Sequence, residues 1–282
     1  MAPRGFHTVT GPFYKALRAD CSSYQDGEGL WPAPSQRGPG AWTRVPDAKP
    51  VAGSGGLALH HLSGLPNALG TRLFIAEAED IVAVTEFGVI AGRARLLRPI
   101  AVWDAQAARH FAADCAEQVL DALDWHATDD DRPGAAIAVA RDFADGLVSL
   151  DTMYRTWADV HTLARGHTCD IPCPEAWQAA WTAFDALLEL DPGDAARIAV
   201  QMAHESAVLA ASWWAGWKAR MDAAWTACTA ARVEELREAA ARAASEQADA
   251  DVRRWQAGRL EQYLHGWTDR AAAAPEQALH RG

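Results

Sequence analysis

The sequence predicts an α+β protein: a small β-containing N-terminal domain over residues 1–100, followed by an alanine- and tryptophan-rich all-α helical bundle over residues 104–266. Two observations support this class. The first hundred residues combine loops rich in glycine and proline with short β-branched runs, whereas alanine-rich segments of helical period dominate the rest. In addition, 11 of the 13 tryptophans lie beyond residue 100. We therefore expect two structural units that meet near residue 105, and a frayed tail over 271–282.

In the N-terminal domain, residues 20–56 are expected to be loop because glycine and proline are too dense for regular structure. The segments 69–84 and 88–103 carry β-branched runs bounded by turn residues, which predict two to four strands. Strand periodicity places Arg93 and Arg95 on one face of such a strand and Ala94 and Leu96 on the other. The domain should end near Pro99.

In the bundle, Asp104 is expected to cap the first helix, and Gly146 to end the second. A third helix should span 149–166, a fourth should begin at Pro174, and a turn at Asp191 should start a long helical stretch that runs to residue 266. We expect breaks in that stretch near residues 213–216 and 231–234. Helical spacing predicts buried stripes on the first two helices: Ala108, Phe111, Cys115 and Val119 on the first, and Ile137, Ala140, Ala144 and Leu147 on the second.

A row of large apolar residues follows one face of the long helical stretch. Alanine lets helices approach closely, and tryptophan supplies the bulk that alanine lacks. Core packing is therefore the expected role of the row, and exposure of the side chains would instead indicate a groove for a ligand or partner. The row consists of Trp214, Trp217, Met221, Trp225 and Cys228.

The net charge of the chain changes near residue 100, close to the point where its composition changes. Residues 1–100 carry 10 Lys and Arg against 8 Asp and Glu, whereas residues 101–282 carry 16 against 29, a net charge of -13. An acidic helical surface disfavours nucleic acid and favours basic partners or simple solubility. Five scattered cysteines indicate a reducing cytoplasm, and no signal peptide or membrane span is expected.

Three segments of the bundle, 107–120 (AARHFAADCAEQVL), 129–146 (DDDRPGAAIAVARDFADG) and 252–264 (VRRWQAGRLEQYL), occur in a familiar order. They resemble the alanine-rich immunity proteins of bacterial polymorphic toxin systems. The resemblance implies an all-α bundle that binds and neutralises a toxin. The resemblance spans about 160 residues, and its most specific part is the DxRP…AI…AR…AxG pattern.

The N-terminal domain is similar to a domain family of unknown function from phage and actinobacterial proteins. The similarity rests on FYKALRAD (13–20), on the spacing of Trp31 and Trp42, and on the run that ends in ARLLR. That family's pattern carries two histidines beside Cys and Gly. Here YQDG (24–27) and GLALH (56–60) stand at the corresponding places, so both characteristic histidines are absent.

The layout of strands also resembles small ADP-ribosyltransferase-like domains, which gives the alternative hypothesis of a nucleotide-handling enzyme or a degenerate form of one. Such an enzyme would need a convergent pocket. Its candidate binding residues are Tyr24, His60, His61, Glu77, Arg93 and Arg95.

A metal site is the remaining chemical candidate. Thiolate and imidazole are ligands that zinc prefers, and four such side chains lie within 13 residues: His161, His167, Cys169 and Cys173. Their spacing matches no recognised zinc finger, and cysteines packed at a helix junction are the alternative. Otherwise the sequence calls for no cofactor.

No complete catalytic motif occurs on either side of residue 105. The first hypothesis is therefore a non-catalytic cytoplasmic binding protein, an immunity or defence-associated protein whose acidic bundle occludes a toxin or effector. A phage-associated regulator that used the same surfaces would have the same sequence features.

Overall fold

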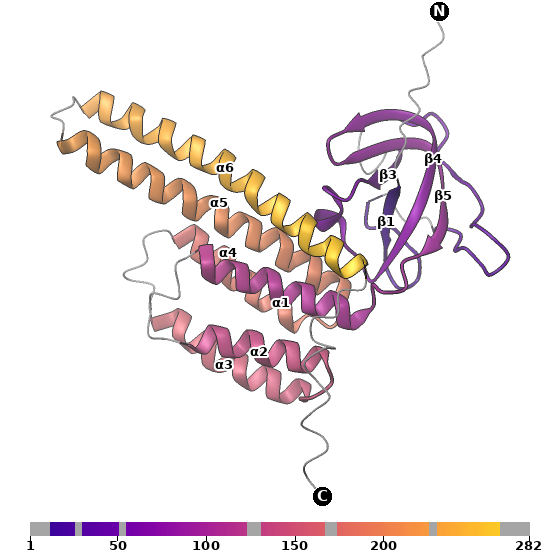
Figure 1. Ribbon diagram of the computed structural model, residues 1–282, viewed down its shortest axis with the longest axis horizontal. Coiled ribbons are helices and arrows are strands. Elements are labelled where there is room, and N and C mark those ends of the chain that lie inside the picture. Colours follow the sequence, from indigo (N-terminus) through magenta and orange to yellow (C-terminus); the bar gives the residue numbers. More distant parts are fainter. Residues whose placement is uncertain are drawn as a thin grey trace, which may run out of the picture.

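The computed structural model describes residues 12–25, 30–50, 55–122, 131–166, 174–225 and 230–265. An antiparallel sheet forms one end of the molecule and long helices form the other, so the protein is α+β, as the sequence predicts (Figure 1). No helix of the described segments is both long and apolar enough to cross a membrane.

The sheet contains β1 (Phe13–Leu17), β2 (Thr43–Arg44), β3 (Leu57–His60), β4 (Arg72–Thr85) and β5 (Gly88–Pro99). Its order is β2-β5-β3-β1-β4, and a further pairing of β4 with β5 closes four of the strands into a ring. A separate cluster of buried residues, including Leu17, Trp31, Phe74 and Leu96, fills this ring. Closure leaves few free strand edges, which stabilises a sheet of this size.

The two predicted strand segments form the β4–β5 hairpin, and β5 ends at Pro99 as expected. Ala94 and Leu96 are fully buried, whereas Arg93 and Arg95 lie on the outer face. The sequence prediction missed β1, β2 and β3, and β2 lies within residues 20–56, which were expected to be loop. On β1, Lys15 is buried, and its Nζ donates to the carbonyl oxygen of Ala58 at 2.9 Å.

The helices are α1 (Ala105–Ala122), α2 (Arg132–Ala144), α3 (Leu150–Gly166), α4 (Pro174–Asp185), α5 (Pro192–Trp225) and α6 (Ala230–Leu264), with short 3-10 turns η1 (Leu65–Ala68) and η3 (Ala186–Leu188). The predicted caps are present. Asp104 Oδ1 accepts from the amide of Ala107 at 2.9 Å, and Asp191 Oδ1 accepts from those of Gly193 and Asp194 at 2.8 and 3.0 Å. These bonds satisfy amides that the first helical turn leaves free.

Two helix predictions are wrong. Leu147 was expected on the buried face of α2, but it is 73 % exposed because α2 ends at Ala144 and Gly146 turns the chain with a φ of 70°. The break expected at residues 213–216 does not occur, since α5 continues through them. A Cβ on Gly216 would lie 3.4 Å from the side chains of Ala241 and Arg237, so the glycine lets α6 pack closely enough to support the helix.

The core-packing prediction for the row of large apolar residues is also wrong. Trp214, Trp217 and Met221 are 47 %, 48 % and 41 % exposed. Trp225 and Cys228 lie outside the described side chains. α5 is longer than α1 and α4, which pack on it, so this face reaches solvent beyond the ends of those helices (Figure 1).

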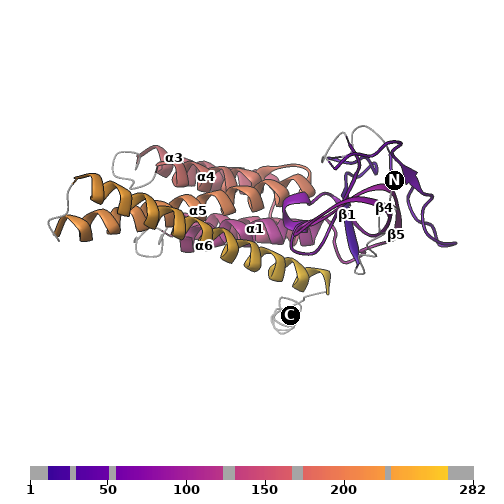
Figure 2. The same ribbon diagram turned by 90° about the horizontal axis from the view of Figure 1, so that it is seen from above.

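The two halves share one hydrophobic core. Buried Ala16, Leu65, Leu69 and Leu73 of the N-terminal half belong to the same cluster as buried residues of all six helices. Polar contacts cross the same boundary. Trp103 Nε1 donates to the carbonyl of Gly70 at 2.9 Å, and Thr71 Oγ1 donates to Asp191 at 2.8–2.9 Å. Figure 2 shows the sheet set against one end of α1, α5 and α6.

Candidate functional site

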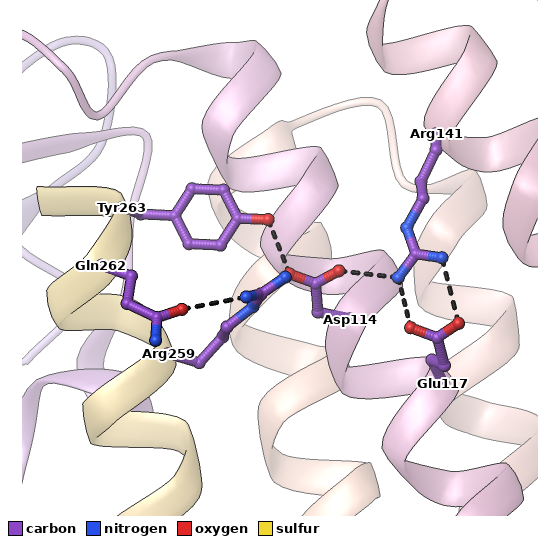
Figure 3. Close-up of polar contacts among 6 residues, drawn as sticks. All are labelled: Asp114, Glu117, Arg141, Arg259, Gln262 and Tyr263. Atoms are coloured by element: carbon purple, nitrogen blue, oxygen red, sulfur yellow. Dashed lines mark hydrogen bonds and ion pairs between the residues drawn. The ribbon is translucent and has the colours of Figure 1, made fainter. Parts of the chain in front are cut away.

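A buried carboxylate on α1 joins three helices of the bundle. Asp114 is 4 % exposed. Its Oδ1 accepts a hydrogen bond from Arg141 of α2 at 2.7 Å, and its Oδ2 accepts from Arg259 Nε and from the Tyr263 hydroxyl of α6 at 2.8 and 2.6 Å. Figure 3 shows these groups converging from α2 and α6 on the carboxylate. A buried charge is tolerated only when it is paired and hydrogen-bonded in this way.

The cluster extends outward along α1 and α6. Arg141 also contacts Glu117, at 2.6 Å to Oε2 and 3.2 Å to Oε1, and Arg259 donates to Gln262 at 2.9 Å (Figure 3). Glu117 lies one helical turn after Asp114, so one guanidinium reaches both carboxylates. These contacts hold α1, α2 and α6 in one fixed arrangement.

The surroundings shift the pKa values of Arg141 and Tyr263 within the cluster. Burial alone would lower the pKa of Arg141, but hydrogen bonds to Glu117 and Asp114 outweigh burial and raise it. Burial, with the negative charge of Asp114, raises the pKa of Tyr263 well above its ordinary value. The hydroxyl therefore keeps its proton and remains a donor. Burial also raises the pKa of the Cys115 thiol, so this cysteine is not a reactive thiolate.

An open hollow lies beside the cluster, between α1 and α6. Its volume is about 560 Å³, and it is lined by Asp114, Glu117, Gln118, Arg254, Trp255, Gly258, Arg259 and Gln262. Trp255 is 36 % exposed at this hollow, and Arg254 has a side chain that is 74 % exposed. Tryptophan and arginine are the residue types that most often dominate protein–protein binding energy. The hollow therefore lies beside the hydrogen-bonded Asp114 cluster and presents two exposed side chains of these types, Trp255 and Arg254.

The three motif segments of the bundle meet at this one place. Asp114 and Glu117 belong to segment 107–120, Arg141 to segment 129–146, and the α6 residues to segment 252–264. Residues 102–173 match the family model described as "Imm-5 like putative immunity protein". The match supports an immunity-type role and, with it, a protein partner. No curated protein and no solved structure matches the chain.

The three segments are recognisable from the sequence, but the site formed by the polar residues within them was not predicted. The usable signal was an acid at the centre of an alanine-rich helix. Asp114 interrupts the apolar pattern beside Cys115, and a buried acid must find cationic partners elsewhere in the chain. Which arginines fill that role depends on packing between helices far apart in sequence.

The candidate residues of the N-terminal domain lie in separate contact groups. Arg95 pairs with Glu77 at 2.7 Å, and Arg93 pairs with Glu79. The guanidinium groups of Arg93 and Arg95 lie over the ring of Trp42, at 4.1 and 4.5 Å from its centroid respectively. Each arginine therefore has a carboxylate and an aromatic partner on the outer face of the β4–β5 hairpin, and this arrangement stabilises the sheet surface.

The other N-terminal candidates lie elsewhere on the sheet. His60 pairs with Gly88 on β5, five residues before Arg93, which corresponds to roughly 17 Å of strand. Its Nε2 is 2.9 Å from the Gln25 side chain, and the ring of His61 packs against Phe13. Tyr24 lies beneath Arg18, where burial and the negative charges of Asp194 on α5 and Asp191 just before it raise the pKa of the tyrosine. These contacts do not bring the candidate residues into one pocket.

The candidate zinc ligands cannot be placed. His167, Cys169 and Cys173, with the side chain of His161, lie outside the described residues. Within the described part of the chain, no group of three or more His, Cys, Asp or Glu side chains could hold a metal ion.

Proposed function

We propose that this protein is an immunity-type binding protein that neutralises a toxin by occluding it, and that the hollow between α1 and α6 is where the toxin docks. The observation that carries the proposal is the convergence of three immunity-like segments on the Asp114 cluster at the base of that hollow. A cluster that fixes three helices preorganises the surface above it, which lowers the entropic cost of binding.

Charge supports a basic partner. The chain from residue 101 onward carries a net charge of -13, and such a field accelerates the encounter with a positively charged protein. The hollow itself is balanced, since Asp114 and Glu117 lie beside Arg254 and Arg259. We therefore assign long-range attraction to the acidic bundle and short-range recognition to Trp255 and Arg254.

Co-expression tests the proposal. The genes adjacent to the one that encodes this chain are expressed singly, and those whose products stop growth are then co-expressed with it. We expect growth to be restored against at least one product. The double variant W255A/R254A should lose that protection, with binding weakened at least about 30-fold, the effect of losing one interface hot spot.

The matched control is W214A, which removes an exposed tryptophan of α5 that does not line the hollow and should leave protection intact. Failure of the chain to protect against any growth-inhibiting neighbour would refute the immunity role. Protection that survives W255A/R254A would refute only the docking site.

A further inference from the structure

The ends of α5 and α6 project beyond the bundle as a two-helix arm, formed by residues 211–225 of α5 and 230–245 of α6. α4 packs beside α5 only up to the start of this arm, where Ala176 contacts the Ala210 region and Ser206 donates to the carbonyl of Ala176 at 2.9 Å. Both views show α5 and α6 extending past the other helices (Figures 1 and 2). Among the described helices, the arm segments of α5 and α6 therefore pack on each other and extend beyond the rest of the bundle.

The arm exposes a cluster of aromatic rings. Trp214 and Trp217 are 47 % and 48 % exposed, and their rings meet edge to face at 5.9 Å. Trp213 stacks on Trp217 at 6.3 Å. Beside them, a hollow of about 620 Å³ opens between the two helices, with Arg237 and Ala241 on its α6 side. α6 has no buried residue before Val252 within its described side chains. The arm therefore leaves much of its tryptophan surface exposed to solvent.

The charge of the arm differs from that of its surroundings. It carries five Lys and Arg against four Asp and Glu, a net charge of +1, while the remainder of residues 101–282 carries 11 against 25, a net charge of -14. Ion pairs within each helix neutralise its charges: Lys218 with Asp222, Arg232 with Glu235, and Arg237 with Glu234. A basic toxin would be drawn to the remainder of the bundle. The arm suits a neutral helical surface rich in alanine and tryptophan.

Such a surface exists on a second copy of this chain. Each arm is about 25 Å long, and two adjacent helices are about 20 Å wide, so a face offers roughly 500 Å². Two faces together reach about 1,000 Å², the lower limit for a specific interface. Two arms of charge +1 also repel each other little. We propose that two copies associate through their arms as an isologous dimer, in which the four arm helices form a bundle around the tryptophans.

This dimer goes beyond the proposed function, because it requires no toxin. Sedimentation velocity of the full chain tests it between about 1 and 100 µM, the range expected for so small an interface. We expect the apparent mass to rise with concentration from 30.4 kDa toward twice that value. The W214E/W217E variant should remain a monomer throughout, with association at least about tenfold weaker.

The matched control is L147K, which adds charge at a side chain that is 73 % exposed outside the arm and should leave dimerisation unchanged. Circular dichroism checks that each variant keeps its helices, and W214Q/W217Q replaces the glutamate pair if that pair unfolds. A wild-type chain that stays monomeric at the highest concentration would overturn the proposal. A dimer that persists in both W214E/W217E and W214Q/W217Q would also overturn it. Growth protection is measured separately, so failure of the dimer leaves the immunity role standing.

Discussion

At the scale of single residues, Asp114 determines how the bundle is assembled. Its buried carboxylate accepts a hydrogen bond from Arg141 of α2 on one oxygen, and from Arg259 and Tyr263 of α6 on the other. Removing one member of a buried pair leaves uncompensated charge, which costs far more than the pair contributes while intact. The cluster therefore selects one arrangement of α1, α2 and α6 among the many that alanine-rich helices could adopt.

We predict that D114N lowers the free energy of unfolding by about 3–5 kcal/mol, because it leaves Arg141 and Arg259 without their buried carboxylate. Urea denaturation monitored by circular dichroism measures the change. The control is E117Q, which removes a carboxylate whose side chain is 52 % exposed and should cost less than about 1 kcal/mol. Equal losses in the two variants would show that Asp114 has no special role.

At the scale of elements, α5 contacts both halves of the protein. Its first turn lies against the loop before β4, and the close approach requires glycine at position 193. A Cβ there would lie 2.2 Å from the backbone nitrogen of Thr71 and 2.3 Å from the carbonyl carbon of Gly70. Further along the same helix, the absence of a side chain at Gly216 lets α6 pack close to α5. Close packing of neighbouring elements therefore accounts for the glycine at both positions of α5.

We predict that G193A destabilises the protein by about 1–3 kcal/mol, because the added methyl group forces the two backbones apart. Alanine normally stabilises a helix relative to glycine, so a decrease in the free energy of unfolding would indicate a steric clash at this position. G258A is the comparison: nothing lies within 4 Å of its added Cβ, and it should stabilise by up to about 1 kcal/mol. Thermal unfolding of the two variants compares them directly. Stabilisation by G193A would mean that the contact at Gly70 is not tight.

At the scale of the whole molecule, the sheet and the bundle are joined by a continuous core. Leu65, Leu69 and Leu73 are almost completely buried in the cluster that also contains Phe111 and Val200. Arg253 of α6 lies over the ring of Phe87 in the β4–β5 turn, which adds a second point of contact. Neither half can unfold without exposing apolar surface of the other.

We predict a single calorimetric unfolding transition whose van't Hoff and calorimetric enthalpies agree. T71V, which removes the hydroxyl that donates to Asp191 across the boundary, should lower the melting temperature by several degrees without splitting the peak. Two resolved transitions in the wild-type chain would show that the halves fold independently.

Local patterns predicted the elements well and the contacts between elements poorly. The caps at Asp104 and Asp191, the β4–β5 hairpin, and the stripe through Phe111 follow from residues close in sequence. The exposure of Trp214 could not be predicted, because helical periodicity shows which residues share a face but not whether another helix covers that face.

The sequence by itself determined an α+β chain with two compositional halves, the positions of most helix starts, and three immunity-like segments. Only the tertiary structure decided that these segments meet at Asp114, that the halves share a core, and that the tryptophans of α5 reach solvent. The reason is the range of the forces involved. Capping and amphipathic period act within a few residues, whereas the pairing of a buried charge and the covering of an apolar face depend on segments up to 149 positions apart.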